Sequence, residues 1–82
     1  MFYVYLLESE KDNTWYVGYT TDLKDRLAKH NHGGNASTRA KRPFKLICFE
    51  GYLNKKDALG REDFLKSGAG HRFIKKTVEA LS

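Results

Sequence analysis

The sequence predicts an α+β fold with a small sheet, and three observations support this class. Residues 2–8 and 15–20 are two runs rich in aromatic and β-branched side chains, joined by the polar turn 9–13, which predicts an antiparallel hairpin. Residues 44–53 form a third apolar run. Segments with helical spacing precede and follow that run, so the predicted element order is β-β-α-β-α-α.

The predicted hairpin places several tyrosines on a common face, because side chains alternate along a strand. Tyr3 and Tyr5 share one face of the first strand, and Tyr16 and Gly18 share one face of the second. Gly18 leaves space that a larger side chain would fill. Strand tyrosines usually serve packing, so each tyrosine alone is only a weak indication of a site.

The first helix is expected to start near Thr21 or Asp22, which are both good capping residues, and to run to about Asn31, before two glycines that end it. Leu23, Leu27 and His30 form its apolar stripe, with Arg26 at the edge. The ordinary interpretation is a surface arginine and a core histidine. The functional interpretation gives Arg26 a phosphate to bind and gives His30 a role in proton transfer.

The third run, residues 44–53, is apolar on both faces around its centre. This pattern predicts a central strand covered by helices on at least part of both sides. A second helix is expected from Asn54 through Ser67. The glycine-containing segment 68–70 is expected to break the chain before a last helix.

Glu62 is the polar residue that most needs an explanation. On the second helix it falls between Ala58 and Leu59, inside the predicted apolar stripe. A buried carboxylate without a partner costs several kcal/mol. One explanation is an ion pair with a lysine or arginine. The other is a metal ligand, because Mg²⁺ takes one or two protein carboxylates and completes its shell with water and substrate phosphate.

The net charge of +5 arises from one part of the chain. Residues 28–49 contain no acid, and the rest of the sequence balances basic against acidic side chains. The basic residues of this acid-free segment are Lys29, Arg39, Lys41, Arg42 and Lys45. They indicate either a solvated basic loop or a surface that holds the phosphate backbone of a nucleic acid.

Length and composition predict a single domain over residues 1–82. The lone cysteine, Cys48, cannot form an internal disulfide, so nothing indicates an oxidising compartment. We find neither a signal peptide nor an apolar run near the roughly 20 residues that span a membrane. The expectation is a cytoplasmic protein without a membrane partner.

Taken in order, these motifs resemble the GIY-YIG nuclease superfamily, most closely its small stand-alone members. The resemblance covers most of the chain, from Phe2 to at least Glu62. The segments that carry it are Tyr3-Val4-Tyr5, Tyr16-Val17-Gly18-Tyr19-Thr20-Thr21-Asp22-Leu23, Arg26-Leu27, His30-Asn31, Thr38-Arg39, Arg42-Pro43, Ala58-Leu59 and Arg61-Glu62. Tyr3 stands where the family name has glycine, and no asparagine follows Asn54, although some members carry one after the glutamate.

The resemblance implies a three-stranded antiparallel sheet flanked by helices and a nuclease site. It assigns the catalytic positions to Tyr5, Tyr16, Arg26, His30 and Glu62, with Gly18 as a structural residue at the site. Glu62 is implied to bind a divalent metal, Mg²⁺ or Mn²⁺. In this hypothesis Tyr5 or Tyr16 positions or deprotonates the attacking water, His30 assists, and Arg26 neutralises charge on the phosphate.

The predicted function is metal-dependent hydrolysis of phosphodiester bonds in DNA, in repair or recombination. Lys29, Arg39, Lys41, Arg42 and Lys45 are expected to hold the strand without selecting sequence, so specificity is expected to be low or to depend on a protein partner. One alternative is a nucleic-acid-binding module without cleavage activity. Another is a docking domain whose basic loop binds an acidic protein.

Overall fold

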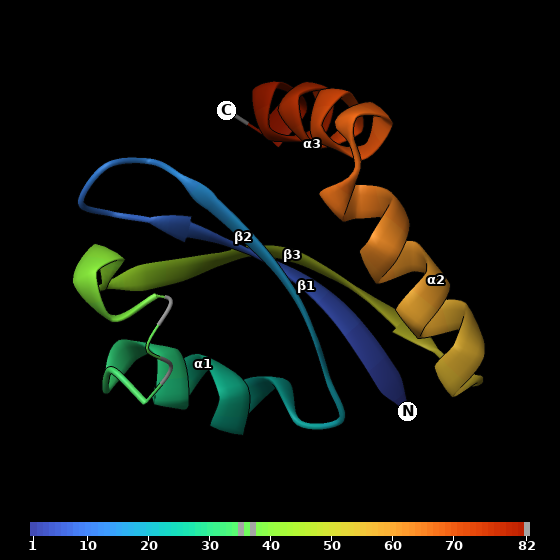
Figure 1. The fold of residues 1–82 in the computed structure, drawn as a ribbon, viewed down its shortest axis with the longest axis horizontal. Helices are drawn as coiled ribbons and strands as arrows, with labels where there is room; N and C mark the ends of the chain where they lie inside the picture. Colours follow the sequence, from blue (N-terminus) through green and yellow to red (C-terminus); the bar gives the residue numbers. More distant parts are fainter. Residues whose placement is uncertain (35, 37, 82) are drawn as a thin grey trace.

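The computed structural model describes residues 1–34, 36 and 38–81, so Asn35 and Ser37 of the acid-free segment and Ser82 of the predicted domain lie outside it. The elements are β1 (Phe2–Ser9), β2 (Trp15–Thr20), α1 (Leu23–Asn31), the short 3-10 helix η1 (Arg39–Lys41), β3 (Phe44–Tyr52), α2 (Lys55–Lys66) and α3 (Gly68–Leu81). This confirms the predicted α+β class and the order β-β-α-β-α-α (Figure 1).

The sheet is three-stranded and antiparallel, in the order β2-β1-β3. The expectation that the third strand is central was therefore wrong, because β1 occupies the middle. A bulge in β3 explains the misleading pattern: Leu6 pairs with Cys48 and Leu7 with Leu46, which leaves Ile47 as an extra residue. Leu46 packs on one face, whereas the adjacent Ile47 and Cys48 both pack toward the other.

Helices cover both faces of the sheet, as the apolar third run indicated. Figure 1 shows α1 on one side and α2 with α3 on the other. The α1 side holds a core of Tyr5, Leu7 and Phe44. The α2–α3 side holds a second core of Val4, Leu6, Val17, Ala58, Leu65 and Ile74. Among the described residues, the helices are all too short or too polar to cross a bilayer.

Local capping sets the helix ends close to their predicted positions. The Asp22 side chain accepts a hydrogen bond from the Asp25 amide at the start of α1, and Asn54 caps α2 in the same way. The break between α2 and α3 lies at Ser67 rather than within segment 68–70, which is a correction. Ser67 ends α2 in an extended conformation, and its hydroxyl accepts from the Gly70 amide in the first turn of α3.

Candidate active site

A buried chain of three side chains forms the centre of the candidate site. The Tyr5 hydroxyl of β1 lies 3.1 Å from Nε2 of His30 on α1, and Nδ1 of His30 lies 3.0 Å from Oγ1 of Thr38. All three residues are buried. Because both ring nitrogens of His30 have partners, the orientation of the imidazole is fixed. The fold thus joins β1, α1 and the loop before η1 at one point.

Gly18 makes room for Tyr5, as the alternation along the hairpin suggested. The two residues lie opposite each other in the β1–β2 register. A Cβ atom at position 18 would overlap the Tyr5 ring at Cζ and at the hydroxyl oxygen. A side chain at this position would therefore push the phenol away from His30.

Tyr16 lies beside this chain at the edge strand β2, and its side chain is less buried than that of Tyr5. Its ring meets the His30 imidazole edge to face, with 4.9 Å between ring centroids, and lies 6.4 Å from the Tyr5 ring. Phe44 of β3 contacts the imidazole as well, at 6.0 Å. The histidine is consequently enclosed by aromatic rings from every strand of the sheet.

Arg26 projects from α1 one turn before His30 and carries an orphaned donor. Its Nε is buried and has no hydrogen-bond partner among the described residues. A hollow of about 280 Å³ opens next to Arg26 and His30 and is also lined by Lys29, Gly34 and Ala36. Because Arg26 borders this hollow, its guanidinium offers charged N–H donors that suit a carboxylate or phosphate oxygen.

Glu62 of α2 lies partly buried, with 16% of its side chain exposed. Its Oε2 forms an ion pair with Nζ of Lys66 at 3.2 Å, one helical turn later. The ion pair considered from the sequence is therefore present. Lys66 itself is 53% exposed, so its side chain is able to turn into solvent and release the carboxylate.

Electrostatic effects link these residues around the Tyr5 phenol. The pKa of Tyr5 is raised to about 12, first by burial and then by Tyr16 and Glu62, whereas the charge of Arg26 opposes the rise. Burial and the charge of Arg26 lower the pKa of His30 below its usual value of 6.5. At neutral pH the pair is thus a protonated phenol beside an uncharged imidazole.

The basic residues of the acid-free segment do not form one free positive surface. Three of them pair with acids from elsewhere in the chain: Lys29 with Asp25 at 3.1 Å, Lys41 with Asp12 at 3.4 Å and Lys45 with Glu8 at 3.5 Å. Arg39 and Arg42 instead gather at Gly33, and Arg39 donates from Nε to its carbonyl oxygen at 2.9 Å. With Lys11 they line an open groove of about 470 Å³.

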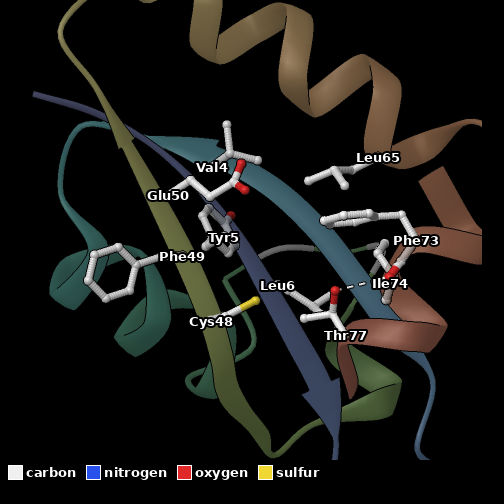
Figure 2. Close-up of a pocket in the computed structure, with 10 residues that line it drawn as sticks. All are labelled: Val4, Tyr5, Leu6, Cys48, Phe49, Glu50, Leu65, Phe73, Ile74 and Thr77. Atoms are coloured by element: carbon white, nitrogen blue, oxygen red, sulfur yellow. Dashed lines mark hydrogen bonds between the residues drawn. The ribbon is translucent and has the colours of Figure 1, made fainter. Parts of the chain in front are cut away.

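The opposite face of the sheet holds an apolar cavity of about 220 Å³ (Figure 2). Leu65, Phe73 and Ile74 enclose it from the helices, and in the figure Phe49 points away from them. Glu50 is its only charged lining residue among the described residues. The Glu50 carboxylate already forms an ion pair with Arg61 of α2. Because its other lining side chains are mostly apolar, we assign the cavity to the packing of α2 and α3 on the sheet.

A single carboxylate, that of Glu62, is the candidate metal ligand that the site offers among the described residues. Among the described residues, no three histidine, cysteine or acidic side chains gather closely enough to hold a metal ion. Glu62 alone matches the pattern in which one carboxylate, water and a substrate phosphate complete the shell of Mg²⁺. The donor set therefore fits magnesium or manganese, provided that Lys66 leaves Glu62.

The site also contains residues that the sequence did not indicate. Thr38 was noted only as part of a motif, yet its hydroxyl contacts the buried histidine. Lys11 lies in the polar turn after β1, far in sequence from Arg39 and Arg42, but lines the same groove. No periodicity or spacing links these positions, because loops bring them together.

A protonated phenol, a neutral imidazole and an orphaned guanidinium donor are chemical groups suited to binding and protonating a phosphate ester. The sequence pattern of the GIY-YIG catalytic domain matches residues 1–73. The chain therefore belongs to the GIY-YIG family, a family of nucleases that act on nucleic acids.

Proteins of several bacteria are similar to this chain in sequence. A UPF0213 protein of Streptococcus pneumoniae serotype 4 is 48% identical over 65 residues, which are 78% of this chain but only 65% of that protein. A UPF0213 protein of Pediococcus pentosaceus is 42% identical over 99% of this chain and 88% of its own length. The solution NMR structure of UPF0213 protein BH0048 from Bacillus halodurans superposes with a TM-score of 0.57 at 36% identity, covering 93% of this chain and 84% of that one.

Proposed function

We propose that this protein is a metal-dependent endonuclease that hydrolyses phosphodiester bonds in DNA with low intrinsic sequence specificity. The observation that carries the proposal is Arg26, which borders a hollow next to His30 and whose Nε has no partner among the described residues. The scissile phosphate fits this hollow, because its oxygens satisfy the guanidinium and its charge offsets that of Arg26.

Glu62 would hold the metal, Mg²⁺ or Mn²⁺. When bound, the ion supplies Lewis-acid stabilisation to the phosphate and the leaving 3′ oxygen. The charge of Glu62 makes the smallest of the four contributions that shift the pKa of Tyr5, so the carboxylate lies within electrostatic reach of the phenol. Lys66 must give up its ion pair first, so binding of the metal and movement of Lys66 are coupled.

Water attacks phosphorus as the bond to the 3′ oxygen breaks, and Tyr5 is better placed than Tyr16 to pass on the proton that water loses. A phenol with a pKa of about 12 does not ionise at neutral pH. Its hydroxyl lies 3.1 Å from Nε2 of His30. Tyr5 therefore accepts the proton of water while its own proton moves to His30, and the 3′ oxygen takes a proton from solvent. Tyr16, at the rim, orients the attacking water.

The strand would lie along the groove of Lys11, Arg39 and Arg42, where the arginines are already held by the loop at Gly33. The three remaining predicted contacts, Lys29, Lys41 and Lys45, exchange their present acidic partners for phosphates. Such contacts read no sequence. Any selectivity then comes from DNA structure or from a protein partner, in a cytoplasmic role in repair or recombination.

The test is a cleavage assay on labelled single-stranded, duplex and branched DNA at low salt, with and without Mg²⁺ or Mn²⁺. Glu62→Gln and Arg26→Gln are compared with Glu79→Gln and Arg72→Gln, which alter exposed residues of α3. Metal-dependent cutting that is lost only in the first pair is the expected result. Cutting that survives in both members of that pair contradicts the assigned site.

One observation favours a second candidate, a nucleic-acid-binding module without cleavage. Lys66 occupies the carboxylate that the metal requires. If every DNA is bound but none is cut with either metal, the ion pair closes the site and this second function applies. The variant Lys66→Gln tests the ion pair as the cause, because it frees Glu62. Metal-dependent cutting that appears only in this variant shows that the ion pair closes the wild-type site, whereas no cutting even in the variant means that the site lacks nuclease activity.

A further inference from the structure

Thr38 makes a contact that neither its position nor its motif explains. The residue lies at the N-terminal end of η1, where its side chain forms no capping hydrogen bond. It is nevertheless only 3% exposed, and its Oγ1 lies 3.0 Å from Nδ1 of His30. The hydroxyl therefore faces the imidazole on the side opposite Tyr5.

The two tautomers of the neutral imidazole have opposite consequences for Tyr5. If Nδ1 carries the proton, it donates to Thr38, and Nε2 accepts the phenolic proton of Tyr5. The lone pairs of the phenol oxygen are then available to a water in the site. If Nε2 carries the proton, the imidazole donates a hydrogen bond to the Tyr5 oxygen, and the phenolic proton points outward into the site. The Tyr5 hydroxyl then faces the water as a donor and cannot accept a proton from it.

We propose that Thr38 is a positioning residue that holds His30 in the Nδ1–H tautomer and so directs the Tyr5 proton toward Nε2. The buried Tyr5 hydroxyl needs an acceptor, and His30 Nε2 is at hydrogen-bond distance. A threonine hydroxyl accepts from Nδ1–H as readily as it donates. The catalytic consequence of this proposal rests on the proposed nuclease function, whereas the tautomer itself does not.

The surroundings of His30 are consistent with an uncharged partner in this role. The titratable or charged groups that face the imidazole are Tyr5 from β1, Tyr16 from β2 and Arg26 from its own helix. A carboxylate in place of Thr38 would hold a proton on the ring and favour the imidazolium. A hydroxyl orients the ring and leaves it neutral, ready to accept a proton.

The tautomer is measured directly by ¹⁵N NMR of the histidine ring nitrogens in the metal-free protein without DNA. We expect Nδ1–H in the wild type and in Thr38→Ser, and loss of that preference in Thr38→Val and Thr38→Ala. Thr77→Val is the matched control, because the Thr77 hydroxyl bonds only to the carbonyl of Phe73 among the described residues. An Nε2–H tautomer in the wild type overturns the proposal, as does an unchanged tautomer in both apolar variants.

Cleavage then tests the consequence separately. Thr38→Val is expected to cut DNA at least about tenfold more slowly, with Thr38→Ser restoring most of the rate. Equal rates in the valine and serine variants, with the tautomers differing as expected, overturn the catalytic part. If the wild type cuts no DNA, the proposed function fails, but the NMR result still decides whether Thr38 sets the tautomer.

Discussion

Replacement of Gly18 by alanine tests the geometry of the site through protein stability. The added methyl group would enter space that the Tyr5 ring fills. Tyr5 is 3% exposed and is enclosed by His30 and Tyr16, so its ring has little room to withdraw. The variant must therefore move the phenol, and the hydrogen bond to His30 must lengthen or break.

Two costs and one gain set the size of the effect. Overpacking of a buried site costs about 1–3 kcal/mol, and buried polar groups left without partners cost about 1–3 kcal/mol. Replacement of a strand glycine returns about 0.5–1 kcal/mol of backbone entropy. We therefore expect Gly18→Ala to lower the free energy of unfolding by about 1–5 kcal/mol, a large share of the stability of a small domain.

Urea unfolding followed by circular dichroism measures this change, with Gly60→Ala as the matched control. Gly60 lies exposed within α2, and a Cβ atom there would meet nothing within 4 Å. The same substitution should stabilise the protein by up to about 1 kcal/mol at that position. If Gly18→Ala changes the free energy of unfolding by less than about 0.5 kcal/mol, the assigned contact between Gly18 and Tyr5 is wrong.

Three further outcomes are expected from urea unfolding. Burial and a nearby arginine lower the pKa of His30 below 6.5, so the unfolded chain binds a proton at a higher pH than the folded chain does. The free energy of unfolding should therefore fall as the pH decreases below 6.5, by at most about 1.4 kcal/mol per pH unit. The variant His30→Gln should flatten this slope. Gly70→Ala should lower the free energy of unfolding by about 3 kcal/mol or more, because its methyl group would overlap the backbone at the end of α2. Gly68→Ala is the control and should leave the free energy of unfolding nearly unchanged. Equal effects of the two substitutions would contradict this packing. Arg61→Lys should cost about 1 kcal/mol through loss of the paired bonds to Glu50, at 2.9 and 3.2 Å, and a double-mutant cycle with Glu50→Gln should remove most of that cost.

Local patterns in the sequence determined most of the secondary structure. The caps Asp22 and Asn54 and the period of the first helix depend on residues a few positions apart, and each lies where it was predicted. The hairpin was likewise predictable, because a short turn allows little choice of partner. The same alternation indicated that Gly18 makes room on the tyrosine face, which the register of β1 and β2 explains.

Strand order was decided only by the tertiary structure. β1 is central because it pairs with β3 as well as with β2, and a bulge in β3 gave its sequence the pattern of a buried central strand. Such pairing depends on contacts between distant segments, and local propensity carries no signal for it. The break at Ser67 was displaced for a related reason, because Gly70 serves the close approach of α2 and α3 rather than a turn.

The chemical types at the candidate site were evident from the sequence, but their relations were not. Residue type and spacing made Tyr5, Arg26 and His30 candidates, and the family resemblance assigned them to the site. Only the coordinates show that His30 joins Tyr5 to Thr38 and that Glu62 pairs with Lys66. Hydrogen bonds depend on distances of a few tenths of an ångström between side chains from different elements. A sequence therefore determines which groups are available, whereas only the folded chain decides which of them meet.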